Sequence, residues 1–341
     1  MFKYDNKINY LFINWLTLSL FLVFLMIIIG GLTRLTNSGL SITEWELFKG
    51  ILPPLNNSSW NTYFELYKEI PQYKLLNFNM DIEEFKVIFY WEYFHRILGR
   101  LIGLFFLIPL LFFHFNKEII KSYLNLCYLI FFLILAQGFI GWYMVKSGLT
   151  NDVTVSHYRL SLHLSMAFII ISIIFWSIIN FKKKTFKKFF SFSKHNLPFL
   201  LLVILIFLQI NVGAFVSGLD AGKIYQTWPL MGYSYIPNDL VFENFKNLID
   251  FNNHSLVQFY HRNLSYIITL YIFVLSYFIF RKKLINLYKP LTILFVFLIL
   301  QIILGIFTLI SDLNIYLSSA HQINSVLLVF SSINLYYYRI K

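Results

Sequence analysis

Four of the eight histidines occur at repeated places within apolar segments, which makes them the first candidates for chemistry. The segment EYFHRILGRLIG resembles QFYHRNLSYIIT, so that His95 matches His261. Likewise, YRLSLHLSMA and YLSSAHQINS contain His163 and His321 near the start of later segments. Burying an ionisable residue in lipid is costly unless the residue binds something. A single histidine of this kind is more often structural, but four at matched positions favour ligation.

Haem iron is the metal centre that fits this pattern of histidines. Neutral imidazole is a common axial ligand of haem iron, and facing helices of a four-helix bundle can hold a porphyrin between two histidines. A tetrahedral zinc site would need more ligands than either half offers. The single cysteine, Cys127, interrupts an apolar segment and is expected in the core, so any redox chemistry requires a bound cofactor. We expect two histidine pairs that each bind a haem.

Further polar residues could contact the edge or the propionates of such a porphyrin. These candidates are Arg96, Arg100, Gln258, Arg262, His157 and His254. The planar guanidinium group of arginine matches a carboxylate, whereas anchoring at the lipid interface is the alternative role. Of the two histidines, His157 is expected at the membrane edge and His254 in a loop.

Glu92 breaks the symmetry between the two repeated segments. It precedes His95 by three residues and therefore lies on the same helix face, but Gln258 takes its place in the second segment. A partly buried glutamate can donate or accept a proton, and glutamine cannot. The asymmetry predicts chemistry in the first half and a held redox group in the second. Pairing of Glu92 with Arg96 alone is the structural alternative.

The elements that must position these residues are membrane helices. The composition is 58% hydrophobic and only 13% charged, and the mean hydropathy is +0.66. A helix needs roughly 20 apolar residues to cross a bilayer. Stretches of this kind lie at 11–33, 87–115, 122–145, 157–180, 197–217, 256–280, 288–311 and 316–338. The sequence therefore predicts an all-α polytopic membrane protein with eight transmembrane helices, the first of them retained and not removed as a signal peptide.

Charge distribution predicts the orientation of these helices. The net charge is +12, and its lysines and arginines cluster at 181–190, at 281–283 and at the termini. The positive-inside rule then places both termini in the cytoplasm and the long acidic loops on the other side. All four histidines are expected within about two helical turns of that outer surface. The basic loops are topology signals that meet anionic lipid, and we expect no nucleic-acid partner.

The chain is expected to consist of two tandem four-helix bundles. Each half repeats a Gln-x-x-x-Gly pair, Gln137 with Gly141 and Gln301 with Gly305, and GGLTRLTNSGL corresponds to GAFVSGLDAG. The expected boundaries are 1–180 for the first half, including an outer loop at 35–86, then a basic linker at 181–196, and 197–341 for the second half.

Several longer motifs resemble the haem A synthase family, in the form shared by proteobacteria and mitochondria. They are GGLTRLTNSGLSITEW, WEYFHRILGRLIG, GWYMVKSGL with VSHYRLSLHLS, GAFVSGLDAGKIYQTWPLMG, QFYHRNLSY, and LQIILGIFTL with SSAHQ. Their combination over roughly residues 15–335 makes the resemblance specific. It implies an oxidoreductase that converts the C8 methyl group of haem O to a formyl group by successive hydroxylations. The product, haem A, serves cytochrome c oxidase.

The same resemblance implies roles for the histidines and for Glu92. His95 and His163 would be the axial ligands of the substrate haem O, with Glu92 as the catalytic residue. His261 and His321 would bind the iron of a haem b cofactor. Another branch of the family uses a cysteine pair in the first outer loop for electron transfer; this chain lacks that pair, so its electron acceptor is unknown.

The resemblance also implies a location and partners. We expect a bacterial inner membrane, or a mitochondrial one if the protein is organellar, with the haem sites toward the periplasmic side. The expected partners are haem O, haem O synthase, assembly factors of cytochrome oxidase, membrane lipid and further copies of the chain in a homo-oligomer. The outer loop at 35–86, with Trp45, Pro53, Pro54 and the amphipathic SSWNTYFELYKEI, and the loop at 220–232 are expected to act as lids.

Two other functions fit part of the pattern. A di-haem b-type electron carrier would bind both porphyrins without altering either, but it gives no reason for Glu92 to differ from Gln258. It would also usually place haems near both membrane faces. A transporter or lipid-modifying enzyme with a His and Glu proton relay would bind no porphyrin, so the colour of the purified protein distinguishes it.

Overall fold

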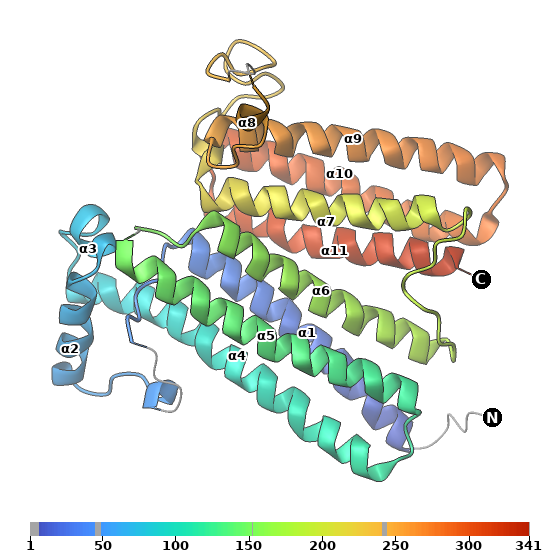
Figure 1. Ribbon diagram of the computed structural model, residues 1–341, viewed down its shortest axis with the longest axis horizontal. Coiled ribbons are helices and arrows are strands. Elements are labelled where there is room, and N and C mark those ends of the chain that lie inside the picture. The colour runs from blue at the N-terminus through green and yellow to red at the C-terminus, as the bar shows by residue number, and fades with distance from the viewer. Residues whose placement is uncertain (1–6, 45–48, 152, 241–243, 341) are drawn as a thin grey trace. The chain divides into compact units, whose positions relative to one another are not determined.

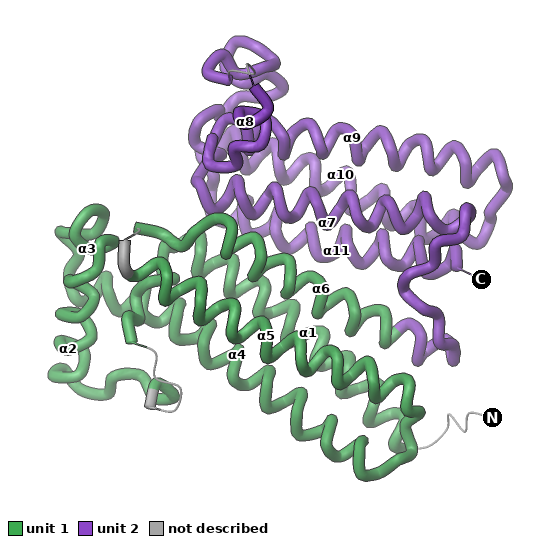
Figure 2. Tube along the Cα trace, viewed as in Figure 1, with its two compact units in different colours: residues 1–178 green, residues 179–341 purple. Residues whose placement is uncertain are grey.

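Two compact units make up the chain, residues 1–178 and 179–341, and each is described by itself (Figure 2). The computed structural model describes residues 7–44, 49–151, 153–240 and 244–340, without the side chains of residues 49, 150 and 151. All regular elements within these ranges are helical, apart from a single bridge between Met231 and Ser234. The expected all-α architecture is therefore confirmed.

Seven helices of the described residues are long and apolar enough to cross a membrane, which agrees with a polytopic membrane protein. The last long helix, α11 (Ile315–Arg339), has 25 residues and would span about 37 Å. Its length suffices, but it contains many serines and asparagines and is less apolar than the other seven. The total of eight spans thus stays a prediction.

The first unit is a bundle of long helices with an elaborate outer loop (Figure 1). Its long helices are α1 (Lys7–Leu35), α4 (Ile82–Asn116), α5 (Lys121–Asn151) and α6 (His157–Lys182). The loop between α1 and α4 contains the 3-10 turn Lys49–Ile51 and the short helices α2 (Asn57–Lys68) and α3 (Pro71–Leu76). These helices match the expected apolar stretches, and α4 and α5 extend beyond them by roughly one turn or more at one end.

Capping explains why α4 begins earlier than its apolar stretch. The Asp81 side chain accepts a hydrogen bond from the Glu84 amide, and the Glu84 side chain accepts one from the Asp81 amide, which closes a capping box. The extra turns before residue 87 therefore project beyond the apolar part of the helix. The helix ends at Asn116, and the left-handed backbone of Lys117, which caps it, turns the chain toward α5.

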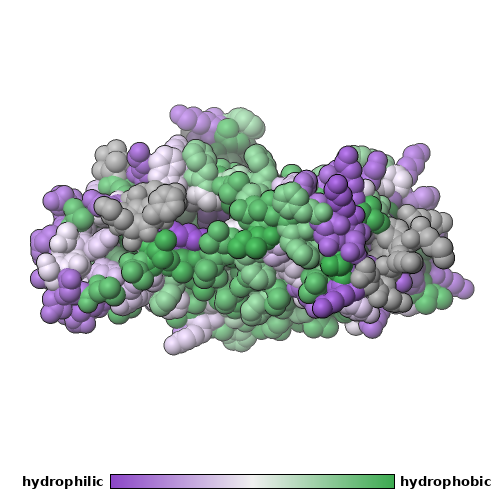
Figure 3. Space-filling model, turned by 90° about the horizontal axis from the view of Figure 1, so that it is seen from below, coloured by the Kyte–Doolittle hydropathy of each residue, from purple (hydrophilic) through white to green (hydrophobic). Residues whose placement is uncertain are grey.

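An aromatic cluster fills the end of the first bundle that lies away from the histidines. Phe12 and Phe113 meet edge to face with ring centres 5.1 Å apart, and Trp15 lies 4.7 Å from Phe106. Cys127 is buried close to this level of α5, as expected for a core residue. Apolar side chains also cover the outer surface, where Figure 3 shows an apolar belt with hydrophilic residues toward both ends. This distribution suits lipid contact.

The outer loop of the first unit folds onto the projecting start of α4. Trp60 of α2 packs against Phe89 with ring centres 5.0 Å apart, and Phe64 against Phe85 at 5.1 Å. The predicted amphipathic stretch is thus a helix whose apolar face is buried. Pro53 and Pro54 precede this helix, whereas Trp45 lies outside the described residues.

The second unit closes a ring of four neighbouring helices. These are α7 (Leu197–Gly218), α9 (His254–Arg281), α10 (Tyr288–Ile310) and α11, and contacts run from α7 to α9, α10, α11 and back to α7. The loop between α7 and α9 contains the short helix α8 (Phe245–Leu248). The basic segment 181–196 packs on α11, where the Tyr336 hydroxyl donates to the Phe189 carbonyl at 2.6 Å.

Candidate functional site

Each of the four histidines lies against a glycine of a neighbouring helix. A Cβ atom added to Gly141 of α5 would lie 2.9 Å from Cε1 of His163, and one added to Gly30 of α1 would lie 3.3 Å from Cε1 of His95. Real Cβ atoms almost never approach another heavy atom within 3.0 Å. A side chain at Gly141 would therefore have to displace the imidazole, and one at Gly30 would push it by a few tenths of an ångström, because each ring lies against the backbone of a neighbouring helix.

The second unit repeats this arrangement. The corresponding distances are 3.0 Å from Gly213 to His261 and 2.9 Å from Gly305 to His321. In both units the glycine is near the end of its helix and the histidine near the start of the next, so both histidines of a unit lie toward the same end of its bundle. His163, His261 and His321 lie about 9 to 10 Å from the first residue of their helices, and His95 about 20 Å because α4 is longer.

A glutamine one turn before the glycine fastens three of these histidines. Gln137 Nε2 donates to the His163 carbonyl at 3.0 Å, and Gln301 Nε2 donates to the His321 carbonyl at 3.2 Å. The sequence motif Gln-x-x-x-Gly thus has a structural reason, since one residue makes room for the ring while the other ties the two helices together.

The third glutamine, Gln209, was missed by the sequence analysis. Its Nε2 donates to the His261 carbonyl at 3.0 Å and lies 3.1 Å from Nδ1 of the same ring. The signal was available, because Gln209 and Gly213 have the same spacing as Gln137 and Gly141. Comparing the helix before each histidine, and not only the histidine segments, would have found it.

The histidines of the first unit are brought together as a pair. The ring centres of His95 and His163 are 6.3 Å apart and the rings are inclined by 30°. Two imidazoles that each bond one metal at about 2 Å have ring centres about 6 Å apart, so this spacing fits axial ligation of one iron. Nδ1 of both rings is buried without a hydrogen-bond partner among the described residues. Buried polar atoms without a partner are costly, which is consistent with a polar or ionic group being bound here.

The second pair has comparable features. His261 of α9 lies against Gly213 of α7, and His321 of α11 lies against Gly305 of α10, within the same ring of helices. Nδ1 of His321 has no hydrogen-bond partner among the described residues. The residues present therefore fit a haem in this bundle as they do in the first.

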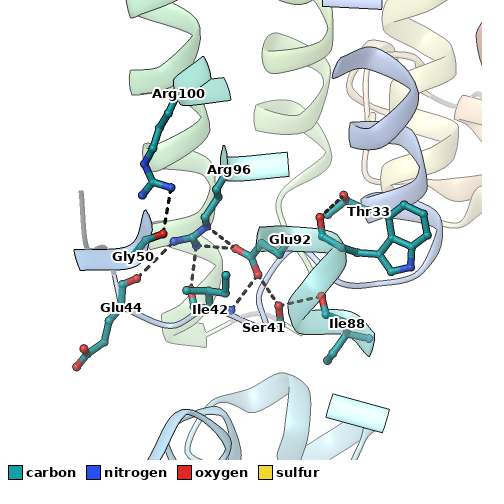
Figure 4. A network of polar contacts seen from close by, with 10 residues as sticks. Thr33, Ser41, Ile42, Glu44, Gly50, Ile88, Glu92, Arg96 and Arg100 are labelled. Atoms are coloured by element: carbon teal, nitrogen blue, oxygen red, sulfur yellow. Dashed lines mark hydrogen bonds and ion pairs between the residues drawn. The ribbon is translucent and has the colours of Figure 1, made fainter. Parts of the chain in front are cut away.

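Glu92 is buried and lies at the centre of a polar network that joins α4 to the outer loop (Figure 4). Its Oε2 accepts hydrogen bonds from the Ser41 hydroxyl at 2.7 Å and from the Ile42 amide at 2.9 Å. Its Oε1 pairs with Arg96, whose Nε lies 3.0 Å away and whose Nη2 lies 2.5 Å away. The carboxylate thus holds the loop and neutralises the arginine, which is the contact that the structural alternative predicts.

The arginines near His95 also bind the outer loop. Arg96 donates to the carbonyl oxygen of Ile42 at 2.9 Å, and Arg100 donates to that of Gly50 at 3.4 Å (Figure 4). Both arginines line a small cavity beneath this loop together with Tyr63. These contacts fasten the loop over the outer end of α4.

Gln258 and Arg262 occupy the corresponding places in the second unit. Gln258 Nε2 donates to the Tyr225 carbonyl at 2.9 Å, and Arg262 donates to Tyr225 at 2.8 Å and to Thr227 at 2.8 Å. Nε of Arg262 and Oε1 of Gln258 are buried without a hydrogen-bond partner in the described part of the chain. This arginine therefore has spare capacity to bind an anion such as a propionate.

The two remaining histidines lie at helix starts. His157 is the first residue of α6 and is buried, with its ring 4.1 Å from that of Tyr158. His254 is the first residue of α9, so the expectation that it lies in a loop is wrong by one residue. It is exposed and borders an open pocket with Asp239 and Ser255.

Comparisons with known proteins agree with these observations. The model of the family COX15-CtaA, described as Cytochrome oxidase assembly protein, matches residues 13–333 of the chain. Similar curated proteins include the haem A synthase of Pelagibacter ubique, 50% identical over 96% of both chains, and that of Rickettsia felis, 41% identical over 93% of this chain and 94% of the relative. The haem A synthase of Maricaulis maris is 40% identical over 92% of each chain. The chain belongs to the cytochrome oxidase assembly protein family COX15-CtaA.

Proposed function

We propose that this protein is a haem A synthase of a bacterial inner membrane, which oxidises the C8 methyl group of haem O to a formyl group. The observation that carries the proposal is the buried pair of His95 and His163, whose ring centres are 6.3 Å apart and whose rings are backed by glycine. Relatives 40% to 50% identical over almost their full length carry the name haem A synthase.

The first bundle is the proposed substrate site. His95 and His163 would bind haem O through its iron and so hold the porphyrin at a fixed depth and tilt. The conversion takes the methyl group through an alcohol to a geminal diol, which loses water to leave the aldehyde. With water as the source of the inserted oxygen, it releases four electrons and four protons overall, and an external electron acceptor must take up the electrons.

Glu92 is the proposed catalytic residue of this site. It is on the same face of α4 as His95, one turn nearer the outer loop, so its carboxylate borders the bound porphyrin. Its proton acceptor role requires Arg96 and the Ser41 hydroxyl to keep the carboxylate oriented, and both hydrogen bonds are present. Arg100 lines the small cavity beneath the outer loop, and we propose that it assists propionate binding.

The second bundle is proposed to hold a haem b between His261 and His321. A haem b supplies one-electron redox chemistry when bound. Gln209 and Gln301 hold its two ligands by their backbone carbonyls, and the buried Nε of Arg262 is available for a propionate.

We propose that both haem sites face the periplasm. The basic segments 181–196 and 281–283 follow the ends of α6 and α9 that lie away from the histidines. By the positive-inside rule those ends are cytoplasmic. Substrate would therefore be delivered at membrane depth by a haem O synthase, and product handed on to oxidase assembly factors.

The test is mass analysis of haems extracted from membranes that express this protein together with a haem O synthase. Haem A or its hydroxylated intermediate should appear only when both proteins are present. Haem B and haem O alone, with the protein loaded, would contradict the proposal and favour a di-haem electron carrier.

A further inference from the structure

The helix that faces His95 differs from the three that face the other histidines. FLMIIIGG (24–31) and FLQINVGA (207–214) align without a gap, so that Met26 stands where Gln209 stands in the second bundle. Gln137 and Gln301 occupy the same place relative to the remaining two glycines. One of four equivalent positions has therefore exchanged a hydrogen-bond donor for a thioether.

The difference between glutamine and methionine removes a hydrogen bond between two helices, and not merely a polar group. Each of the three glutamines donates its Nε2 hydrogen to the backbone carbonyl of the facing histidine, at 3.0 to 3.2 Å. Methionine has nearly the same length as glutamine but no N–H to donate. The side chain of Met26 packs instead beside Gly99, where an added Cβ would lie 3.4 Å from its Cε.

The contact between α1 and His95 is also the loosest of the four. A Cβ on Gly30 would lie 3.3 Å from the His95 ring, compared with 2.9 to 3.0 Å at the other three glycines. A methionine next to this contact is flexible and adapts to shifts of its neighbours. Both observations, from different atoms, indicate that His95 is held less firmly than the other three histidines.

We infer that Met26 is a positioning residue that makes His95 the displaceable ligand, so that the first bundle exchanges its porphyrin while the second retains its own. The inference rests on the proposed function. Substrate and product of that reaction have the same iron and the same propionates, and differ only at one methyl carbon. A site that must release product after every turnover therefore needs one weak ligand, whereas a site for a resident cofactor needs none.

The experiment is haem transfer from the full-length protein in lipid nanodiscs to excess apomyoglobin. Both bundles are loaded with haem B, and the phase that belongs to the first bundle is identified by its absence from His163→Ala. Three variants are compared with the wild type: Met26→Gln, Met26→Leu as the control of similar volume, and Gln209→Met as the reverse exchange. Helicity and elution volume show that each variant is folded.

The wild type should release haem faster from the first bundle than from the second. Met26→Gln should slow the first-bundle phase about fivefold, the factor for one additional buried hydrogen bond, and Gln209→Met should speed the second-bundle phase by a similar factor. Met26→Leu should leave both phases unchanged. Carbon monoxide binding to the reduced first-bundle haem, which requires a histidine to leave, should slow in Met26→Gln alone.

Equal first-bundle rates in the wild type and Met26→Gln would overturn the inference. So would equal slowing in Met26→Leu, because the effect would then belong to the thioether. The assay uses haem B and needs no oxidation. Absence of haem A in the extraction experiment together with the expected rate differences would therefore reject the proposed function and leave the role of Met26 standing.

Discussion

The outer ends of the two bundles use the same positions for different electrostatics. In the first, Glu92 and Arg96 form a buried ion pair that also binds the loop at Ser41 and Ile42. In the second, Gln258 and Arg262 bind the loop through carbonyl oxygens, and the arginine meets no carboxylate among the described residues. Loop attachment is thus common to both bundles, and at this helix position only the first has a carboxylate.

The loops themselves are held by different chemistry. The first loop contains a buried chain of hydrogen bonds, in which Asn77 donates to the Tyr67 hydroxyl at 2.7 Å and Tyr67 donates to Gln72 at 3.0 Å. In the second, Asp239 accepts hydrogen bonds from Tyr225 and Ser255, both at 2.6 Å. Apart from the contacts with Glu92 and Arg96, the network of loop residues is therefore neutral in the first bundle, whereas that of the second contains a carboxylate.

The largest expected effect is the loss of haem from one bundle only, when one of its two histidine ligands is removed. His261→Ala or His321→Ala should abolish the haem of the second bundle, whereas His163→Ala should abolish only that of the first, because each iron would lose one of its two ligands. Haem content per protein, measured by pyridine haemochrome spectra, checks this. Loss of both haems from each variant, in a protein that is still folded, would mean that the two sites are not independent.

The next effect concerns Glu92, the carboxylate that the second bundle lacks at the matching helix position. Glu92→Gln keeps the shape and makes this position like Gln258, so both haems should remain bound. Oxidation should stop short of the aldehyde, with at least a hundredfold loss of haem A formation, the usual contribution of a general acid or base. Mass analysis of extracted haems measures it. Gln258→Glu is the matched control and should retain activity; full haem A production by Glu92→Gln would refute the catalytic role.

The glycine contacts should respond alike in both bundles. Gly141→Ala places a methyl group 2.9 Å from Cε1 of His163 and should weaken haem binding in the first bundle about tenfold, because the ring must move. Gly305→Ala should do the same in the second. Gly138→Ala is the control one turn away, since an added Cβ there meets nothing within 4 Å. Equal haem affinity of Gly141→Ala and Gly138→Ala by titration would show that the ring has room to spare.

The smallest effect is the opposite pH response of the two loops. Burial raises the pKa of Tyr67 to about 12, against the lowering by the Asn77 hydrogen bond. Burial alone would raise the pKa of Asp239, but hydrogen bonds from Ser255 and Tyr225 bring it below its ordinary value. The stability from Tyr67 is fully present below the unfolded pKa near 10 and is lost as pH rises toward 12, whereas that from Asp239 is lost as pH falls through its lowered pKa.

Limited proteolysis at acidic and at alkaline pH tests this difference between the two loops. Acid should expose the second loop to cleavage a few-fold more than the first, and alkali the first more than the second. Asp239→Asn and Tyr67→Phe should each remove the response of one loop only. The same acid sensitivity in Asp239→Asn as in the wild type would show that another group controls the second loop.

The sequence predicted the long helices well, because apolar stretches are a local signal, whereas the four histidines stand out through the internal repeat. The apolar stretches coincide with helices within about a turn at most ends, and the start of α4 differs because the capping box lies outside the apolar run. The pairing of Glu92 with Arg96 was foreseen as an alternative because their spacing of four residues places them together on one helix face.

Contacts between distant segments could not be predicted in the same way. The arginines bind loop carbonyl oxygens, and such backbone acceptors have no signature in residue type. Gln209 was not predicted, although it has the same four-residue spacing to Gly213 that Gln137 has to Gly141. The fold of the outer loop depends on Trp60 and Phe64 finding α4, which is a tertiary contact between amphipathic elements.

The histidine and glycine contacts have a consequence for mutational tolerance. Four positions, Gly30, Gly141, Gly213 and Gly305, have only a hydrogen atom between their backbone and an imidazole. The spacing of the helices at that level thus depends on glycine, whose side chain is a single hydrogen atom. Every substitution at these positions adds atoms next to the imidazole ring. The lipid-facing positions of the same helices accept many apolar residues. Substitutions should therefore accumulate quickly on the outside of these bundles and slowly at these four positions, most slowly at Gly141 and Gly305, where an added Cβ would lie 2.9 Å from the ring.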